Sequence, residues 1–309
     1  MKRLGRIFLA CALLAGCDEA SSTSGSNGSN GSTTDGGGSN TSSDAGPTTC
    51  TLTANTTPSG VTSPSGCPVL IRDTSACEAE RIAAGLSGFW LKFSCRVSLR
   101  KTTANGRSVV EATTDGQPDY LSNYQATSSP CWESYTDAIQ NPNLISAQSE
   151  IIDFYTAPDT TESTVQGGIV GLTISGVPMF GNFAAPGDDI YRESTTFDRC
   201  AGHPQQTGVY HVHTEPFSIT YDDSNFIGVM RDGHPVYGRR DADGSYPSLD
   251  TYGGHTGTTP DSPSTPVYHY HLSLQTSTNA NTSGQTGWFL TGPSGKYRGT
   301  AAPCTSGCR

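Results

Sequence analysis

Short runs in which apolar and polar residues alternate, interrupted by Gly, Pro, Asn and Asp, make up most of the chain after residue 88. Alternation with a period of two predicts strands, and the interrupting residues predict turns. Helical character is confined to residues 77–86, with Gly88 as the expected stop. The pattern predicts an all-β fold, either a turn-rich sandwich or a barrel-like domain. The predicted strands are residues 89–99 and 107–112, joined across an Asn105-Gly106 hairpin turn, then 151–155, 168–174, 217–221 and 226–230.

The N-terminus carries a different pattern, an uninterrupted apolar run over residues 7–15 that follows Lys2, Arg3 and Arg6. This is the layout of a secretory signal, and the run is too short to span a bilayer. Residues 14–17, Leu-Ala-Gly-Cys, resemble the lipobox of bacterial lipoproteins, which implies removal of residues 1–16 and acylation of Cys17. We therefore expect an exported protein of the cell envelope, lipid-anchored to the inner or the outer membrane. The alternative is an ordinary signal peptide whose Cys17 later joins a disulfide.

The segment after Cys17 is almost entirely Ser, Gly, Asn and Thr as far as residue 49. Such a composition has no apolar surface to bury, so it cannot offset the entropy lost on ordering. We therefore predict a disordered tether over residues 17–49 and one β-rich domain over residues 50–309.

Composition and charge narrow the class further. The 309 residues include 36 Gly and 19 Pro, which disfavours a helical bundle. Without the three basic residues of the signal, 15 basic residues face 28 acidic ones, a formal charge of −13. Nucleic-acid binding needs clustered cations, so we expect no nucleic-acid partner.

The number of cysteines is typical of a protein exported to an oxidising compartment. One of the ten cysteines lies in the signal and Cys17 is the acylation site, which leaves eight. No Cys-x-x-Cys pair occurs, so a thiolate metal site is disfavoured, and we expect four disulfides of undetermined connectivity. The eight are Cys50, Cys67, Cys77, Cys95, Cys131, Cys200, Cys304 and Cys308.

The second half of the chain contains an internal repeat. Three blocks recur in the same order with offsets of 52 to 58 residues, which predicts duplicated units at about residues 168–213 and 226–271. Stacking about a pseudo-two-fold axis would bring equivalent residues together. The recurring blocks are residues 176–181 and 233–238, residues 197–203 and 249–255, and residues 209–213 and 267–271.

The first of these blocks reads Gly-x-Pro-x-aromatic-Gly in both copies. Glycine opens a turn, proline fixes φ, and the aromatic side chain returns to the core. We interpret the block as structural, with His234 as the one member that could do more.

The histidines are the strongest chemical signal. All seven lie between His203 and His271, and six occupy equivalent positions in the two units. Residues i and i+2 of a strand share a face, so each His-x-His presents two imidazoles as a chelating pair, which suits zinc or copper. Two such strands side by side would supply four imidazoles, with two more histidines and two carboxylates as further ligands or acceptors. The predicted set is His211, His213, His269 and His271, then His203, His255, Asp198 and Asp250.

These motifs resemble a known family. Tyr-His-Tyr-His at residues 268–271 and Tyr-His-Val-His at residues 210–213, with the Gly-His pairs and the Gly-x-Pro turns, are similar to the YHYH-domain proteins, which are exported bacterial and some eukaryotic proteins. The likeness extends over about residues 116–299. Val212 and Tyr120 depart from the family pattern. The resemblance implies a class and no reaction.

Three functions stay open at this point. The first is a membrane-tethered protein that binds a transition metal, and the second is a metal-dependent enzyme on the same site. The third is an adhesion or carbohydrate-binding module whose histidines are structural. No recognised catalytic motif is present, so we lean away from an enzyme. Asp241 and Asp243 have the spacing of a weak calcium loop, with a plain turn as the alternative.

Overall fold

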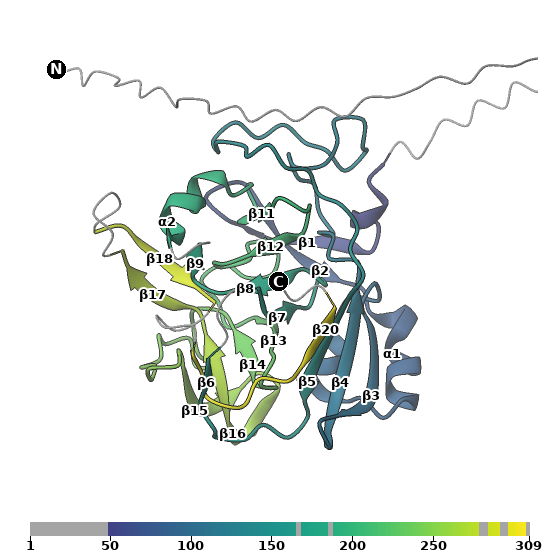
Figure 1. The fold of residues 1–309 in the computed structure, drawn as a ribbon, viewed down its shortest axis with the longest axis vertical. Helices are drawn as coiled ribbons and strands as arrows, with labels where there is room; N and C mark the ends of the chain where they lie inside the picture. The colour runs from purple at the N-terminus through teal and green to yellow at the C-terminus, as the bar shows by residue number, and fades with distance from the viewer. Residues whose placement is uncertain (1–48, 165–167, 185–187, 278–283, 291–295, 307–309) are drawn as a thin grey trace, which may run out of the picture. The chain divides into compact units, whose positions relative to one another are not determined.

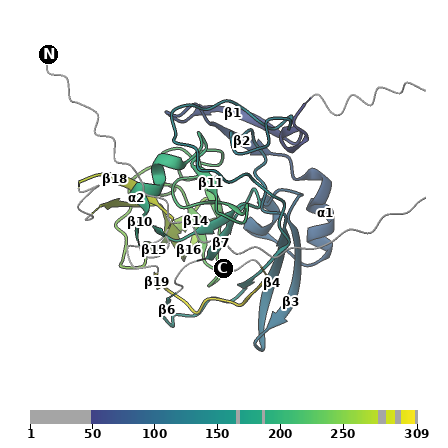
Figure 2. The same cartoon turned by 45° about the horizontal axis from the view of Figure 1, so that its top comes forward.

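The computed structural model describes residues 49–164, 168–184, 188–277, 284–290 and 296–306 (Figures 1 and 2). All of them belong to one compact unit, Ala45–Arg309. Strands dominate, and α1 (Ser75–Ala83) and α2 (Ile190–Glu193) are short. No helix in these residues is long and apolar enough to cross a membrane. The all-β prediction is confirmed, while the predicted signal, Cys17 and nearly all of the tether lie outside the described residues.

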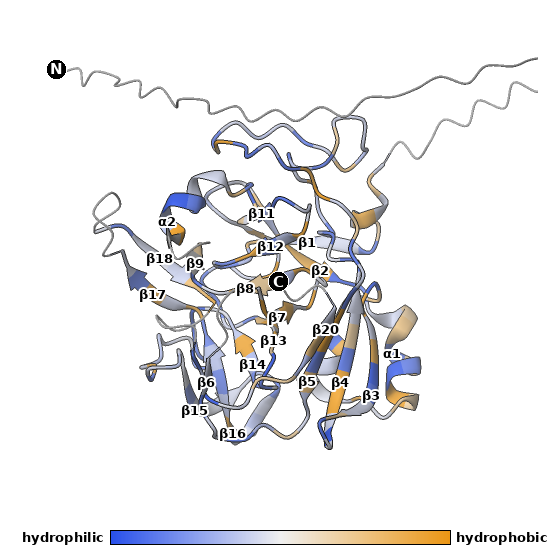
Figure 3. Ribbon diagram, viewed as in Figure 1, coloured by the Kyte–Doolittle hydropathy of each residue, from blue (hydrophilic) through white to orange (hydrophobic). Residues whose placement is uncertain are grey.

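The largest sheet has eight strands, in the order β11-β12-β8-β7-β13-β14-β16-β15. Its inner strands are short and fully buried, and Figure 3 shows apolar colour at β7 and β14 against polar colour at β15. The strands are β7 (Ile169–Thr173), β8 (Pro178–Phe180), β11 (Gly202–Pro204), β12 (Tyr210–Val212), β13 (Phe226–Met230), β14 (Pro235–Tyr237), β15 (Gly254–Thr259) and β16 (Ser262–His271).

The strand order shows the internal duplication directly. From the outside inward, β11-β12-β8-β7 of the first unit matches β15-β16-β14-β13 of the second. The pairing directions match as well, because β12 runs parallel to β8 and β16 runs parallel to β14. The two halves meet where β7 pairs antiparallel with β13, so a pseudo-two-fold axis passes between these strands.

This symmetry overturns one expectation. The two His-x-His strands do not lie side by side, because β8, β7, β13 and β14 separate β12 from β16. Five strand spacings place them about 24 Å apart. The axis runs through the inner strands, so equivalent outer strands are carried to opposite ends of the sheet.

A second sheet packs against the first. Its four strands are β3 (Ser98–Ala104), β4 (Arg107–Thr114), β5 (Glu150–Tyr155) and β20 (Cys304–Ser306), in the order β20-β5-β4-β3. Asn105 and Gly106 both have positive φ, as the predicted hairpin turn requires. One apolar cluster contains Phe154 of this sheet with Leu172 and Phe226 of the larger one. Neither sheet closes into a barrel within the described residues, so the arrangement is sandwich-like.

Four two-stranded sheets complete the described strands. Figure 1 shows the β17–β18 pair at the left, beside α2 and β9. The pairs are β1 (Thr56–Thr62) with β2 (Pro68–Arg72), β6 (Ser163–Thr164) with β19 (Lys296–Tyr297), β9 (Phe183–Ala184) with β10 (Asp188–Asp189), and β17 (Ser273–Thr276) with β18 (Thr286–Phe289).

Disulfides connect the N-terminal part to the sheets. The bonds are Cys50–Cys131, Cys67–Cys200 and Cys77–Cys95. Cys304 is also disulfide-bonded, and Cys308 lies outside the described residues. Cys67–Cys200 matters most for the site, because it ties the β1–β2 pair to the loop that precedes β11.

Two predicted strands are wrong. Residues 88–92 form a turn of 3-10 helix, and Trp90 stacks on Phe93 with ring centroids 5.7 Å apart. Residues 217–221 form a turn in which the backbone N–H of Ile219 donates to the carbonyl of Pro216. In both segments apolar residues three or four apart face one another, which is helical spacing that the alternating pattern concealed. The helix also ends earlier than predicted, at Gly85 with φ of 77°.

Candidate metal centres

Six of the seven histidines gather in two separate groups. The first cluster is His203, His211 and His213, and the second cluster is Asp241, His255, His269 and His271. In each cluster the donor atoms lie within 4.8 Å of one another. The six predicted imidazoles therefore form two groups of three, one in each unit.

Strand register builds the first cluster. His203 of β11 is paired directly with His211 of β12, and His213 follows two residues later on the same face. The Nε2 atom of His211 lies 3.1 Å from Nε2 of His203 and 3.0 Å from Nε2 of His213. All three side chains are buried.

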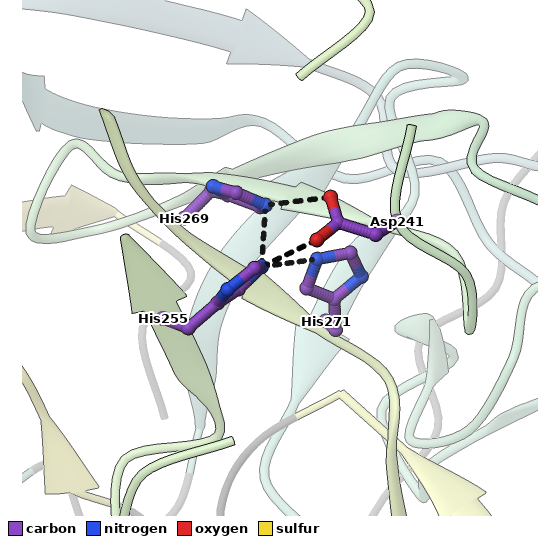
Figure 4. A group of neighbouring side chains, drawn as sticks. All are labelled: Asp241, His255, His269 and His271. Carbon is purple, nitrogen blue, oxygen red and sulfur yellow. Dashed lines mark hydrogen bonds and ion pairs between the residues drawn. The ribbon is translucent and has the colours of Figure 1, made fainter. Parts of the chain in front are cut away.

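The second cluster repeats this construction at the other end of the sheet (Figure 4). His255 of β15 is paired with His269 of β16. The Nε2 atom of His255 lies 3.1 Å from that of His269 and 3.3 Å from that of His271. Asp241 closes the group, with Oδ2 at 3.3 Å from His255 Nε2 and Oδ1 at 3.8 Å from His269 Nε2.

Backbone carbonyls fix the tautomer of the rings. The Nδ1 atoms of His211 and His269 each lie 3.0 Å from a carbonyl two residues earlier, Val209 O and Val267 O. Nδ1 of His271 lies 2.8 Å from the carbonyl of Gly238. A carbonyl can only accept, so Nδ1 carries the hydrogen and Nε2 of the neutral ring carries a lone pair. His213 Nδ1 bonds the carbonyl of Gly181 in the same way.

In the first cluster the lone pairs of His211 and His213 therefore face one another across 3.0 Å, and in the second cluster the lone pairs of His269 and His271 both face Nε2 of His255. Such an arrangement is repulsive by itself and becomes favourable when a cation lies between the nitrogens. In a tetrahedral site with metal–nitrogen bonds of about 2.05 Å, ligand nitrogens are about 3.3 Å apart. The observed separations of 3.0 to 3.3 Å fit that geometry. The residues present thus suit a transition metal bound through imidazole.

Burial keeps these rings in the neutral form that metals require. It lowers the pKa of His203 to about 3 and that of His213 to about 4. It also lowers the pKa of His271 to about 4 in the second cluster. The pKa values of His211 and His269 are lowered too, with burial as the main cause. Protons therefore compete weakly with a metal at neutral pH.

The Gly-x-Pro-x-aromatic-Gly blocks turn out to support the clusters. Phe180 of the first block stacks on His211 with ring centroids 4.0 Å apart. Its equivalent Tyr237 meets His269 edge-on at 5.4 Å. The glycine that ends each block supplies the carbonyl that orients the last histidine of the cluster. The blocks are structural, as interpreted from the sequence. Their aromatic rings and glycine carbonyls pack around the imidazoles and orient them.

Asp198 and Asp250 lie outside both groups of donors. Asp198 is buried and accepts hydrogen bonds from Ser122 at 2.6 Å and from the hydroxyl of Tyr210 at 2.7 Å. Asp250 accepts equivalently from the hydroxyl of Tyr268 at 3.0 Å. Each also accepts backbone N–H groups of its own loop. Of the two roles considered for these carboxylates, the structure places them as acceptors that hold the first tyrosine of each Tyr-His-x-His motif.

Different carboxylates approach the imidazoles. Asp241 belongs to the β14–β15 connection, and Glu193, at the end of α2, belongs to the matching β8–β11 connection. Glu193 Oε2 lies 3.6 Å from His203 Nε2 and 3.9 Å from His213 Nε2. Asp241 and Glu193 are not at equivalent positions in the two repeat units. Comparing the units within the sequence therefore could not identify them.

The loop that holds Asp241 was considered as a calcium loop. Asp241 instead faces imidazoles, which calcium disfavours. Asp243 accepts the backbone N–H of Ser245 at 2.8 Å and is not among the grouped donors. Arg240 and Tyr246 flank this loop, and both bond the carboxylate of Asp222. This loop is therefore an Asp-Gly turn whose first residue completes the second cluster.

His234 is the one histidine outside both clusters. Its Nδ1 lies 3.2 Å from the carbonyl of Tyr268, and its ring contacts the rings of Tyr268 and Tyr270. Side chains alternate along β16, so His234 lies on the tyrosine face of the sheet and the second cluster lies on the opposite face.

Comparison with known proteins now gives the family. The model described as YHYH protein matches residues 155–245. The chain contains a YHYH domain over these residues. The matched part contains the whole first cluster, Glu193 and Asp241, and it ends before the Tyr-His-Tyr-His tetrapeptide at residues 268–271. No curated protein and no solved structure matches the chain.

Proposed function

We propose that this YHYH-domain protein binds two transition-metal ions, one in each histidine cluster, with zinc or copper as the metal. The observation that carries the proposal is the convergence of Nε2 atoms at 3.0 to 3.3 Å in two independent places. Core histidines that serve packing alone have no reason to turn three Nε2 atoms toward one point, and still less to repeat this in both units. The carboxylates of Glu193 and Asp241 support the same conclusion, because each brings negative charge to its cluster.

Metal analysis of the purified full chain tests the proposal. The wild type should hold about two equivalents of metal per chain. The variant His211→Ala/His213→Ala should lose one, and His269→Ala/His271→Ala should lose the other. His234→Ala is the matched control, because it removes the only histidine outside the clusters and should keep both equivalents. Equal metal content in all four proteins, with unchanged folding, would contradict metal binding and favour a module with structural histidines.

A metal-dependent enzyme on the second cluster is the alternative function. The observation in its favour is exposure, because the side chains of Asp241 and His255 keep 19% and 20% of their surface accessible. Solvent can therefore approach a metal there, and a bound water would be a potential nucleophile. Spectroscopy on a cobalt-substituted protein checks this: four-coordinate binding by protein groups alone would exclude the enzyme, whereas a bound water that anions displace would support it.

We further propose that Cys17 anchors the protein to a membrane of the cell envelope and that residues 17–49 act as its tether. The support is the lipobox-like sequence directly after a short apolar run. Cys17→Ser should release the protein into the soluble fraction and abolish labelling by an alkyne fatty acid. Cys11→Ser, which alters a cysteine inside the removed signal, is the control and should leave the anchoring unchanged.

A further inference from the structure

A cavity of about 510 Å³ lies at the outer edge of the second unit. Its walls come from residues 158–160, from the loop before β15, from the start of β15 and from three side chains, His234, Tyr268 and Arg298. It is on the tyrosine face of β16, and His255 is the one member of the second cluster that also lines it. Arg298 and Tyr268, on which the inference about the cavity rests, belong to neither cluster.

The duplicated fold shows that this face is not built for stability alone. Three equivalent positions on the tyrosine face carry Ser or Val in the first unit, and the valines belong to the apolar core. In the second unit the same positions carry groups that ionise or hydrogen-bond. The same strands fold in both units, so the backbone does not require the polar set. The equivalent pairs are Ser175 with Asp232, Val177 with His234, and Val212 with Tyr270.

The first unit also fills the space that the second leaves open. There, Tyr120 packs edge-on against Tyr210, and their hydroxyls are 3.0 Å apart. The Cys67–Cys200 disulfide covers the same region. In the second unit Tyr252 stands where Cys200 stands in the first, and Arg298 faces the ring of Tyr268 at 5.8 Å in place of Tyr120.

The cavity contains one positive charge that the surrounding protein does not neutralise. The guanidinium of Arg298 lies over the rings of Tyr252 and Tyr268, and in the described part of the chain no carboxylate is within ion-pair distance of it. Two acids also line the cavity, and only one of them is paired with a cation. Asp159 pairs with Arg107 at 2.7 Å, and Asp250 accepts from Tyr268. A ligand with a negative group would complete this arrangement.

We infer that the cavity binds a small hydroxylated carboxylic acid of the sugar-acid class. Arg298 pairs with the carboxylate, for which its planar fork is suited. The ring of Tyr268, which lines the cavity, offers an apolar surface to the carbon skeleton. Hydroxyl groups of the ligand meet the hydroxyls of Thr160, Ser248 and Thr256, which line the same cavity. Its volume accommodates one sugar ring with room for ordered water.

Calorimetric titration of the full chain with D-glucuronate tests the inference, with two comparison ligands. D-glucuronamide keeps the ring and hydroxyls but lacks the charge, and propionate keeps the charge but lacks the hydroxyls. We expect glucuronate to bind at least 10-fold more tightly than either. Arg298→Gln should weaken glucuronate binding at least 10-fold, and His234→Val, which installs the residue of the first unit, should weaken it as well.

Lys296→Gln is the matched control for charge, because Lys296 is two residues from Arg298 and pairs with Glu162 outside the cavity lining. It should leave binding unchanged, and circular dichroism should show that every variant keeps its fold. Absence of glucuronate binding, equal binding of glucuronamide, or unchanged binding in Arg298→Gln would overturn the inference. Tighter binding of inorganic phosphate than of glucuronate would overturn the assignment to carboxylates. None of these outcomes alters the metal content on which the proposed function depends.

Discussion

The first cluster is buried throughout, whereas the second keeps two of its four members partly accessible. His203, His211 and His213 are at most 5% exposed. In the second cluster His269 and His271 are equally buried, but His255 lies on the edge strand β15 and Asp241 lies on an exposed turn. The two units share strand order and register, so the difference comes from what covers them. We conclude that one duplicated scaffold holds a buried histidine cluster and a partly accessible one.

The segments that pack on the first unit differ from those that pack on the second. The β1–β2 pair and residues 115–125 pack on the first unit, and the Cys67–Cys200 bond fastens them there. Arg72 and Asp119 form a buried ion pair at 2.5 Å in the same region. Tyr252 replaces the disulfide position in the second unit. These added segments close the tyrosine face of the first unit. On the opposite face the first cluster is covered by Phe197, whose ring centroid lies 4.9 Å from that of His203 and 6.0 Å from that of His213.

The largest expected effect comes from removing that cover. Cys67→Ala/Cys200→Ala should lower the free energy of unfolding by about 5 kcal/mol, because the bond closes a loop of 133 residues. Urea denaturation under non-reducing conditions measures this. Cys77→Ala/Cys95→Ala is the control, since it opens a loop of only 18 residues and should cost less. An equal or smaller cost for the Cys67–Cys200 bond would contradict its role.

Acidification should weaken the metal-free protein through its buried histidines. The pKa values of His203 and His213 are lowered to about 3 and about 4, so the unfolded chain takes up protons below pH 6.5 while the folded chain does not. Stability is therefore intact above pH 6.5 and falls as the pH drops toward 4, by roughly 4.5 kcal/mol for the pair between pH 6.5 and 4.5.

Urea denaturation at several pH values, after metal removal, measures that slope. His203→Gln/His213→Gln should flatten it, whereas His234→Gln, at a half-buried position outside the clusters, should flatten it less. A slope that is unchanged in the double variant would show that other groups control the acid response.

The carboxylates should separate the two centres. Asp241→Asn should weaken metal binding in the second cluster by about 10- to 100-fold, because its oxygens are 3.3 and 3.8 Å from two ligand nitrogens. Glu193→Gln should have a smaller effect, because its carboxylate is farther from the first cluster, at 3.6 and 3.9 Å. Competition titrations with a chromophoric chelator measure both affinities, and the reverse order would contradict the comparison.

The smallest expected effect concerns the aromatic ring beside each cluster. Tyr237→Phe copies Phe180 of the first unit and removes a hydroxyl that bonds Asp261 at 2.9 Å. The cost should be about 1 kcal/mol of unfolding free energy with metal content unchanged. Thermal denaturation and metal analysis of this variant check it, and loss of metal would mean that the hydroxyl acts on the second cluster.

Much of the fold could be read from the chain because its signals are local. Alternation predicted β4, β5, β7 and β13, and the Asn105-Gly106 turn has the positive φ angles that this dipeptide favours. Residues 89–99 and 217–221 failed because aromatic and aliphatic runs can pack at helical spacing as readily as at strand spacing. A short apolar segment does not show which of its faces other parts of the chain will pack against. Its secondary structure therefore cannot be decided from the pattern alone.

For the candidate site, the sequence by itself determined which imidazoles belong together within a unit. The spacing of two in His-x-His fixes a shared face, and the repeat singled out six of the seven histidines. Only the tertiary structure decided that the units form two centres, because the axis between β7 and β13 sends equivalent strands to opposite ends. It also decided that Asp241 and Glu193 approach the rings and that Asp198 and Asp250 hold tyrosines. Those carboxylates reach their partners through loops, and the path of a loop is set by what it packs against and not by a periodic pattern.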